Sequence, residues 1–552
     1  MGLFERLLSK RGISSGILDP KYPEGLSGAS EGVFDGGFER FFERLPDVRK
    51  ACERLCQAAD RGEKVLIYGD YDVDGVTASA LMQEILVRIG VPAERIFVML
   101  PDRFKDGYGM SKRCITRAKE LAVGLVVTVD CGSSNGDIIA ELAAAGIETV
   151  VTDHHAIITD LPPAVAVVNP QRGTDTDLQQ LCGAGVAFMV AGELVRMGRI
   201  PEGQEKWLLD LAAIGTICDA MVLTGINRVI CHYGMIVLAK TRRVGLIELL
   251  RTAGVQAPVT TEAVGFQIGP RLNAAGRMKS AEVALRLLTT TSRAEAVRLA
   301  GELEELNAER KKQQNAAVSE VEAVGIGDEP VIFACGKWHE GVLGIIAGRL
   351  VEQYKRPAFV LSEVSPGVYK GSGRSFGDFS LAQALSECQK YLEKCGGHAG
   401  ACGLTVLEEN LSEFRAAVQE FYKGLGLKNQ EEFLEVQEDL TVEDLGEFTT
   451  DLVANLRKLE PYGEGNPEPV WRLPGVLVLD ARAMGAEGQH LRLTVRDGGG
   501  QIMKLIAFYA DAEWLSTPAG SRADVWITLT ENEWQGKKGV EGRIVRLERM
   551  GL

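Results

Sequence analysis

Acidic and imidazole side chains stand at four places where an apolar run of the sequence ends. Three aspartates occupy alternate positions after the run 65–68, and one aspartate follows the run 125–129. An Asp-His-His triplet follows the run 148–152, and a further aspartate ends the run 211–218. Carboxylates this close in the chain repel one another unless a cation binds between them. We therefore expect a divalent-metal site in which these residues take part: Asp70, Asp72, Asp74, Asp130, Asp153, His154, His155 and Asp219.

Oxygen donors outnumber nitrogen donors in this set, which indicates the kind of ion. Several carboxylates with one or two imidazoles suit Mn²⁺ or Mg²⁺ better than Zn²⁺, which prefers thiolate and imidazole. There are enough carboxylates for one to bridge two ions roughly 3.5–4 Å apart, an arrangement that promotes in-line phosphoryl displacement. We expect two Mn²⁺ or Mg²⁺ ions and hydrolysis of a phosphate ester.

Each motif taken alone has a simpler interpretation. An Asp-x-Asp after a strand is usually a turn with solvated acids, and paired histidines often cap a helix. Three such segments, each at the end of a predicted strand, are hard to attribute to chance. The rival phosphate-binding motif G-x-x-x-x-G-K-[ST] follows none of the strands.

Short apolar strands that alternate with helices are expected to position these residues. The strands are 65–68, 125–129 and 148–152, and a helix is predicted over 77–89. This alternation predicts a parallel sheet that is covered on both faces. Because the carboxyl ends of parallel strands lie along one edge, the acids and histidines should converge on one crevice.

The rest of the chain predicts two further domains and a connector. Ser292 and Glu295 fit a capping box, and the helix that follows would run roughly 45–50 Å if unbroken to Ala323. Its length favours a connector, although a bundle helix within one domain also fits. A second α/β unit is expected over 327–425. Short strands after residue 475 predict a small barrel of OB type, in which Trp534 would be either core or a base-stacking platform.

The composition indicates an ordinary soluble protein. The chain has 552 residues, 45% of them apolar, with no apolar run long enough to span a bilayer and no signal peptide, so we expect a cytoplasmic location. The 11 cysteines show no C-x-x-C spacing, which indicates reduced thiols. The net charge of −15 is unevenly placed: residues 404–470 hold 16 acidic and 5 basic residues, whereas 271–315 hold 6 acidic and 9 basic. A local basic groove for nucleic acid is therefore compatible with the overall charge.

At the acids and histidines the sequence resembles the DHH phosphoesterase family, which is named for its Asp-His-His motif. Further segments resemble the RecJ exonucleases within that family, and the likeness extends from about residue 60 to 540. These segments are PRLNAAGRM (270–278), WHEGVLG (338–344), GRS (373–375), GGHAGA (396–401), PYGEGNP (461–467) and EWQG (533–536).

The resemblance implies a role for each matching residue. Asp130 would bridge two ions, Asp70 would lie beside the first ion, and His155 would contact the scissile phosphate or assist proton transfer. Many family members carry His where this chain has Tyr68, so the first metal position would have one nitrogen ligand fewer. The implied metal ligands are Asp72, Asp74, Asp130, His154 and Asp219; the implied catalytic residues are His155 and Asp70; and the implied substrate-binding residues are Arg103, Arg277, Ser372, Arg374 and His398.

The resemblance also implies an architecture and an activity. The expected fold class is α/β, with a parallel-sheet DHH domain, a long helix, a second α/β domain and a C-terminal OB-fold β-barrel. The expected boundaries are an N-terminal extension (1–62), the DHH catalytic domain (63–290), the connecting helix (291–325), a DHH-associated substrate-binding domain (326–426) and the OB-fold domain (430–552).

The implied activity is 5′-to-3′ exonucleolytic hydrolysis of single-stranded DNA in repair and recombination, by a monomer that works with a helicase and a single-strand-binding protein. Two alternatives remain at this point. A DHH enzyme acting on small nucleotides would share the metal site but would need no barrel, and a non-catalytic relative would be free to lose the metal ligands.

Overall fold

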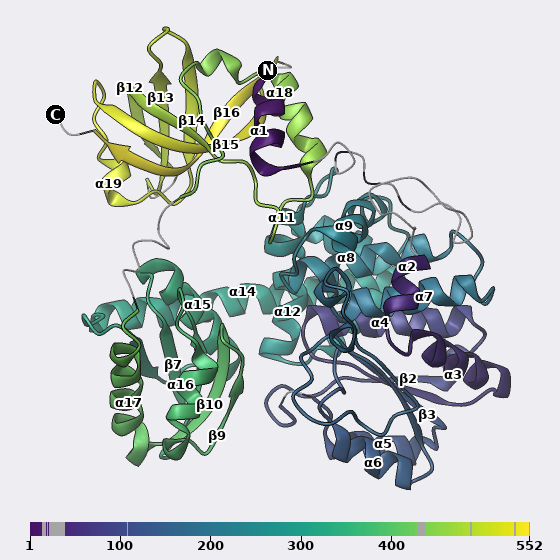
Figure 1. The fold of residues 1–552 in the computed structure, drawn as a ribbon. Coiled ribbons are helices and arrows are strands. Elements are labelled where there is room, and N and C mark those ends of the chain that lie inside the picture. The colour runs from purple at the N-terminus through teal and green to yellow at the C-terminus, as the bar shows by residue number, and fades with distance from the viewer. Residues whose placement is uncertain are drawn as a thin grey trace.

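Three domains are arranged around the long helix α14 (Arg293–Val324), which crosses from the first domain to the second (Figure 1). The structure is a computed structural model of the chain and describes residues 1–13, 18, 20, 22, 39–107, 109–427, 436–485, 488–534 and 537–550. The first α/β domain carries the acidic motifs, the second α/β domain lies at the far end of α14, and the barrel lies next to the first domain near α11 (Thr261–Ala263).

The first sheet is parallel throughout, as the alternating pattern predicts. Its strand order is β2-β1-β3-β4-β5, so the three motif-bearing strands β1, β3 and β4 are neighbours. Every residue of β1 and β3 is buried, which explains why these strands are continuous apolar runs. The strands are β1 (Val65–Tyr68), β2 (Ile96–Met99), β3 (Leu125–Val129), β4 (Glu148–Thr152) and β5 (Ala166–Val168).

Helices cover both faces of this sheet. Val65 and Ile67 pack with α3, α4 and α7 on one face, while Leu66 and Tyr68 pack with α5 and α6 on the other. Further helices extend the domain beyond the sheet. The helices of this domain are α2 (Glu39–Arg44), α3 (Val48–Arg61), α4 (Val73–Arg88), α5 (Lys112–Leu121), α6 (Gly136–Ala144), α7 (Gly183–Arg196), α8 (Leu209–Cys218), α9 (Gly225–Leu238), α10 (Val244–Ala253), α11, the π-helical turn η6 (Val264–Ile268), α12 (Gly269–Met278) and α13 (Glu282–Thr289).

Helix α14 is a connector rather than a bundle helix within one domain. It has 32 residues, about 48 Å at ~1.5 Å per residue, and its N-cap Ser292 accepts the predicted hydrogen bond from the Glu295 amide. Leu299 and Leu303 in its first half belong to the core of the first domain. Ala317 and Val321 near its end belong to the core of the second domain.

The second domain has a mixed sheet in the order β6-β7-β8-β10-β9. Strands β6 and β7 are parallel and the remaining pairs are antiparallel. Its elements are β6 (Ile332–Gly336), α15 (Leu343–Tyr354), β7 (Ala358–Ser365), β8 (Val368–Arg374), α16 (Leu381–Glu387), β9 (Lys394–Gly397), β10 (Ala401–Leu407) and α17 (Leu411–Gly424).

The C-terminal strands close into a five-stranded barrel. The order β12-β13-β14-β16-β15 is completed by pairing of β15 with β12, and β11 adds to β12 outside the ring. The predicted OB-type barrel is confirmed; the side chain of Trp534 lies outside the described part of the chain. The elements are β11 (Leu440–Thr441), α18 (Thr450–Leu456), β12 (Trp471–Met484), β13 (His490–Arg496), β14 (Ile502–Ala507), α19 (Ala512–Leu515), β15 (Arg522–Trp534) and β16 (Lys537–Arg549).

The first residues of the chain pack against the last domain. Helix α1 (Leu3–Arg11) inserts Leu3 and Leu7 into the barrel core, and Arg11 donates to both carboxylate oxygens of Asp439 at 2.6 and 2.7 Å. Helix α3 instead belongs to the core of the first domain. The described helices α1 and α3 of the segment 1–62 thus contribute to two different domains. We propose domain boundaries near residues 62, 290, 325 and 426.

The barrel is docked on the first domain through the segment 458–466. Arg228 of α9 donates hydrogen bonds to the carbonyls of Leu459 (2.7 Å) and Lys458 (3.0 Å). The Thr261 hydroxyl donates to the carbonyl of Tyr462 at 2.7 Å, and the Leu223 amide donates to that of Glu464 at 2.8 Å. These backbone contacts fix the position of the barrel beside the crevice.

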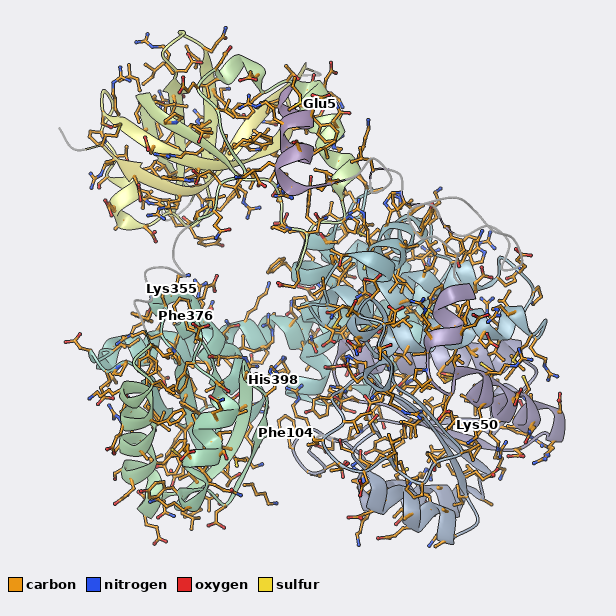
Figure 2. The ribbon with its side chains drawn as sticks, in the orientation of Figure 1. Glu5, Lys50, Phe104, Lys355, Phe376 and His398 are labelled. Carbon is orange, nitrogen blue, oxygen red and sulfur yellow. The ribbon has the colours of Figure 1, made fainter. Side chains whose placement is uncertain are left out.

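The packing of α1 gives a prediction about stability. Leu7→Ala should lower the free energy of unfolding of the barrel by about 2–5 kcal/mol, because it removes a fully buried side chain. The measurement is denaturant unfolding followed by tryptophan fluorescence. Glu5→Ala on the exposed side of the same helix (Figure 2) is the control and should change stability by less than about 0.5 kcal/mol. Equal effects of the two substitutions would contradict the packing of α1 on the barrel.

Candidate active site

The first acidic segment lies in the turn from β1 into α4. Asp72 is the N-cap of α4, and its carboxylate accepts a hydrogen bond from the Gly75 amide at 3.0 Å. Asp74, in the first turn, is buried and accepts hydrogen bonds from the amides of Gly183 (2.6 Å) and Ala184 (2.8 Å). These two amides begin α7, so the positive end of that helix stabilises the Asp74 carboxylate.

Asp130 occupies the centre of the site. It follows β3 in a left-handed conformation with φ 60°, and its amide donates to the Thr152 carbonyl at 2.9 Å. Strain of this kind is common where a side chain must be aimed at a reacting group. Gly183 packs so closely that a Cβ there would lie 2.5 Å from the Asp130 Cβ. The local backbone therefore directs Asp130 into the crevice.

The Asp-His-His triplet separates into an orienting group and two imidazoles. Asp153 is buried, and its carboxylate accepts hydrogen bonds from the Ser133 amide (2.9 Å) and the His154 amide (2.8 Å) and pairs with His155 Nδ1 (2.9 Å). Burial alone would raise the pKa of Asp153, but the hydrogen bond and charge of His155 hold that pKa well below its usual range. Burial opposes the charge of His155, yet its pairing with Asp153 raises its pKa to about 9.

His154 faces the aspartates from all the other segments. Its Nε2 lies 3.1 Å from Asp130, 3.6 Å from Asp219 and 3.8 Å from Asp74. Asp219 is the C-cap of α8, which brings the fourth segment to the same place. Burial lowers the pKa of His154, which favours the neutral imidazole that a metal ion requires.

The side chains form overlapping groups of the size that one metal ion needs. Asp70, Asp72 and Asp130 offer ligand atoms within 4.8 Å of one another, as do Asp74, His154 and Asp219. A third group combines Asp130 with His154 and His155. Asp130 thus reaches both ends of the cluster, and residues that are up to 149 positions apart in the sequence, from 70 to 219, share one crevice.

The carboxylates of this cluster resist ionisation. Burial and the neighbouring carboxylates raise the pKa of Asp70 and of Asp219 to about 8, and raise the pKa values of Asp72 and Asp130 in the same way. One carboxylate oxygen of Asp70 and one of Asp130 are buried without a hydrogen-bond partner among the described residues. Buried acids without donors are costly, and divalent cations would supply the missing positive charge. The donor set therefore fits Mn²⁺ or Mg²⁺.

Tyr68 is not part of the cluster. Its hydroxyl donates to the Gly109 carbonyl at 3.1 Å and accepts from the Ser111 amide at 3.3 Å, on the face of the sheet covered by α5 and α6. Burial raises the pKa of this phenol far above its ordinary value. The candidate group formed by Asp70, Asp72 and Asp130 accordingly contains carboxylates alone.

Arginines from both α/β domains gather beside the acids. Arg103 stacks on the ring of Tyr71, with 4.2 Å between the guanidinium carbon and the ring centroid. Burial, and then the positive charges of Arg103, Arg374 and Arg310, lower the pKa of Arg277 to about 9. Within the described ranges no carboxylate forms an ion pair with any of these four arginines. A group of arginines whose hydrogen-bonding groups are not taken up by carboxylates is suited to phosphate.

The second domain contributes to this group from β8. Arg374 donates to the Ser372 hydroxyl at 3.4 Å, and Ser372 donates to the Cys402 carbonyl at 3.0 Å. The two domains touch here, since a Cβ on Gly341 would lie 1.9 Å from the Arg277 carbonyl oxygen. His398 lies apart, exposed on the turn after β9, and its Nδ1 accepts from the Gly400 amide at 3.2 Å. Figure 2 shows His398 and Phe104 where the two domains face each other.

Three features of the site are not predicted by the sequence: the α7 amides on Asp74, the orienting role of Asp153, and the participation of Arg310. The α7 amides on Asp74 and the orienting role of Asp153 depend on contacts between segments that are distant in the chain. Arg310 stands in the basic stretch 271–315, and that charge was the one sequence signal pointing to it.

Comparison with known proteins gives matches in all three domains. Residues 64–216 match the DHH family, N-terminal domain; residues 328–424 match the DHHA1 domain; and residues 439–546 match the RecJ OB domain.

No helix in the described ranges is both long and apolar enough to span a membrane.

Whole-chain relatives are similar along most of the sequence. The single-stranded-DNA-specific exonuclease RecJ of Bacillus subtilis is 35% identical over 91% of this chain, which spans 63% of that protein. RecJ of Haemophilus influenzae is 32% identical, with 90% of each chain covered. The crystal structure of Thermus thermophilus RecJ in complex with Mn²⁺ superimposes with a TM-score of 0.82 at 31% identity, covering 100% of this chain and 76% of that one.

The parallel sheet with its acidic edge and the attached DHHA1 domain define a protein of the DHH class. The chain is more than 30% identical to RecJ relatives over most of their length, and its barrel matches the RecJ OB domain. It therefore belongs to the RecJ family of single-stranded-DNA-specific exonucleases.

The raised pKa values predict how pH affects the metal-free protein. Asp70 and Asp219 keep protons in the folded state up to about pH 8, whereas the unfolded chain releases them near pH 4. The folded state binds more protons between these values, so the free energy of unfolding should fall as pH rises. His155, with a folded pKa of about 9, acts in the same direction.

The measurement is the midpoint temperature of thermal unfolding in a chelating buffer, from about pH 5 to about pH 8.5. The midpoint should fall over this range, and Mn²⁺ should raise it most at the alkaline end, where the carboxylates are free to bind. Asp219→Asn should flatten the profile. A metal-free profile that is as steep in the variant as in the parent protein would contradict the assignment.

The close approach of Gly183 to Asp130 gives a second prediction. Gly183→Ala should weaken Mn²⁺ binding by about 10–100-fold, because the new methyl group displaces Asp130, which belongs to two of the ligand groups. Titration calorimetry measures the effect. Gly136→Ala, where a Cβ meets nothing within 4 Å, is the control and should bind Mn²⁺ normally. If both variants bind alike, Asp130 does not depend on this packing.

Proposed function

We propose that this chain hydrolyses phosphodiester bonds of single-stranded DNA from the 5′ end, with two Mn²⁺ or Mg²⁺ ions. The observation that carries the proposal is Asp130, which belongs to two ligand groups at once, in a carboxylate cluster whose member Asp72 lies close enough to Arg277 for their charges to interact. Paired metal positions and a phosphate-binding surface are the two parts that an in-line displacement at phosphorus requires.

The ligand groups suggest which residues would hold each ion. Asp72 and Asp130, with Asp70 beside them, would hold one ion, and Asp74, His154 and Asp219 would hold the other, with Asp130 as the bridge. Bound divalent cations would lower the pKa of a water molecule and neutralise charge on the phosphoryl oxygens. The two amides at the start of α7 hold the Asp74 carboxylate in place for this task.

His155 is suited to act on the phosphate rather than on a metal ion. Asp153 orients the ring through Nδ1 and favours the charged imidazolium, and an imidazolium can donate a proton to a phosphoryl oxygen or to the departing oxygen. Its side chain is 41% exposed, compared with 11% for His154, so substrate can reach it. We therefore propose that His155 is the acid–base residue.

The arginines and Ser372 would hold phosphates of the strand near its 5′ end. Arg277 from the first domain and Arg374 from the second lie close enough for their charges to act on one another, so one phosphate could be bound from both sides. His398, further out on the second domain, would meet the backbone away from the reacting end. The 5′ polarity itself rests on membership of the RecJ family.

The setting of the activity follows from the same membership. We propose a monomeric cytoplasmic enzyme of DNA repair and recombination that receives single strands from a helicase and a single-strand-binding protein. The barrel and the second domain favour long DNA over small nucleotides as substrate, since a dinucleotide would not reach the barrel. The complete acid and histidine set favours catalysis over binding alone.

Asp130→Asn tests the proposal. The variant should lose about a thousandfold or more in turnover of 5′-labelled single strands, because both ligand groups lose their shared charge. Its affinity for single-stranded DNA should stay within about threefold, since the arginines remain. Asp160→Asn, an exposed aspartate five residues beyond His155, is the control and should retain full activity.

The same assay compares labels at the two ends and a blunt duplex of the same sequence. The parent protein should release the 5′ label first and should digest the duplex far more slowly. Unchanged turnover by Asp130→Asn would contradict the assignment of Asp130 as a metal ligand. Equal digestion of duplex and single strand would contradict the assignment of single-stranded DNA as the substrate.

A further inference from the structure

Strand β6 of the second domain is an edge strand with an open outer side. Among the described strands it pairs with β7 alone, and the Ile332 amide, which faces β7, donates to the Pro357 carbonyl at 2.8 Å. The backbone groups of successive strand residues face alternate sides, so those of Phe333 and Cys335 face outward. No described residue forms a hydrogen bond with these outward groups. An unpaired edge of this kind is a template for another strand.

Just before β6, a side chain of α17 occupies the place of a neighbouring strand. The Val331 amide donates to Gln419 Oε1 at 3.2 Å, and Gln419 Nε2 donates to the Val331 carbonyl at 2.6 Å. A residue of an adjacent strand would make the same two bonds. Val331 and Gln419 are buried, whereas Cys335 further along the edge is exposed. The fold therefore pairs the start of this edge and leaves its remainder open.

A hollow lies on each face of the open edge. One has a volume of about 280 Å³ and lies beside the end of α14 and Trp338, and the other has a volume of about 640 Å³ and lies beside α17. Glu329, Phe333, Cys335 and Arg415 line both, so the two hollows meet along the edge. Because the side chains of an added strand alternate between the faces of a sheet, each hollow would receive every second one.

Glutamates outnumber cations around this edge, which indicates the charge of the occupant. Arg415 pairs with Glu329 at 2.8 Å, and the other glutamates of the lining are exposed and form no ion pair within the described part of the chain. A second copy of the chain would bring the same glutamates together at a shared edge, which is unfavourable. The charged residues that line the hollows are Glu320, Glu329, Glu408, Glu420, Arg415 and Lys423.

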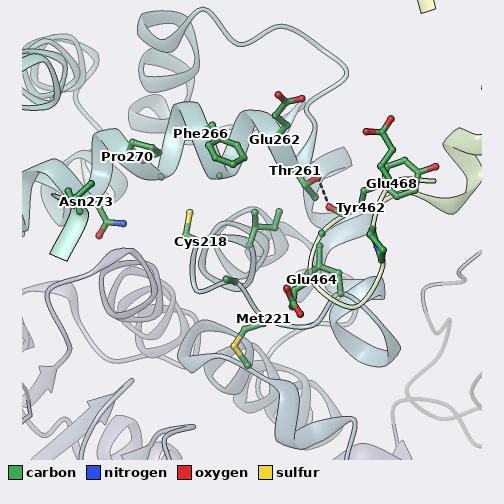
Figure 3. Close-up of a pocket in the computed structure, with 18 of the residues that line it drawn as sticks. Cys218, Met221, Thr261, Glu262, Phe266, Pro270, Asn273, Tyr462, Glu464 and Glu468 are labelled. Atoms are coloured by element: carbon green, nitrogen blue, oxygen red, sulfur yellow. Dashed lines mark hydrogen bonds between the residues drawn. The ribbon is translucent and has the colours of Figure 1, made fainter. Parts of the chain in front are cut away.

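The open edge lies away from the substrate crevice. Strands β6 and β9 are opposite edges of the sheet, and His398 follows β9 where the two domains face each other. Figure 1 shows α17 on the side of the second domain that faces away from the first. The cavity beside the barrel segment 462–468, whose lining includes Arg277 (Figure 3), shares no described residue with the two hollows. An occupant of the edge would therefore leave the crevice open.

We propose that the open edge of β6 binds an extended segment of a second protein in which apolar residues alternate with lysines or arginines. The segment adds a strand beside Phe333 and Cys335. Its apolar side chains enter the hollow beside α14, where Val324 is 89% exposed. Its basic side chains enter the hollow beside α17, near Glu408 and Glu420. The inference concerns a partner protein and does not depend on the proposed activity.

A fluorescent peptide of alternating valine and lysine, titrated with the full chain and followed by fluorescence anisotropy, tests the proposal. It should bind at least about tenfold more tightly than a peptide with glutamate at every lysine position, because the lining glutamates attract the first and repel the second.

Two substitutions at one position test the backbone pairing. Cys335→Pro removes the outward amide and should lower affinity for the valine–lysine peptide about tenfold, whereas Cys335→Ala keeps the amide and should bind like the parent protein. Proline is tolerated on an edge strand where the amide faces outward, so the midpoint temperature of thermal unfolding should change by no more than about 4 °C.

Charge reversal covers the case in which Cys335→Pro does not fold. Glu408→Lys combined with Glu420→Lys should weaken binding of the valine–lysine peptide and strengthen binding of the valine–glutamate peptide, each about tenfold. Glu409→Lys combined with Glu413→Lys changes the net charge equally at exposed positions outside the lining, and should alter neither affinity by more than about threefold.

Equal affinity for the two peptides, or equal binding by Cys335→Pro and Cys335→Ala, would overturn the inference. Absence of binding by the valine–lysine peptide would overturn it as well. Sedimentation of the parent protein covers the remaining occupant: a dimer that Cys335→Pro dissociates would show that a second copy, rather than a basic partner, covers this edge.

Discussion

The structure depends on one electrostatic constraint, which is that several carboxylates are buried together at the edge of one sheet. Their mutual repulsion and burial raise the pKa values of Asp70, Asp72, Asp130 and Asp219. Much of the surrounding fold holds these groups in place despite that repulsion. The α7 amides bind Asp74, and Gly215 lets α8 approach, since a Cβ there would lie 2.7 Å from Asp74 Oδ1. Divalent cations would neutralise these carboxylates, and the proposed chemistry depends on them.

A second cluster, of arginines, complements the first. Acids at the sheet edge attract cations, and the neighbouring guanidinium groups, which form no ion pair among the described residues, attract phosphate. The cluster draws on the first domain (Arg103, Arg277), the connecting helix (Arg310) and the second domain (Arg374). Its members meet only if the domains are held in one arrangement. The net charge of −15 is therefore no guide to the substrate, because the acidic excess lies largely in a different segment, 404–470.

The sequence predicts the parts of this site that depend on local order. Apolar runs that end in acids specify parallel strands with polar ends, and Ser292 with Glu295 specifies the start of α14. The pleat places neighbouring residues of β1 on opposite faces, but the sequence does not say which face Tyr68 occupies. Contacts between distant segments could not be predicted. Arg11 pairs with Asp439 across 428 positions, and the amides of α7 meet Asp74 across 109. The sequence also does not distinguish Arg310 from the other basic residues of the charged helix α14.

Manganese located by anomalous scattering in crystals of the full chain tests the central claim most directly. The account predicts two peaks, one beside Asp70, Asp72 and Asp130, the other beside Asp74, His154 and Asp219, with Asp130 contacting both. A single peak that does not touch Asp130, or none at saturating Mn²⁺, would contradict it.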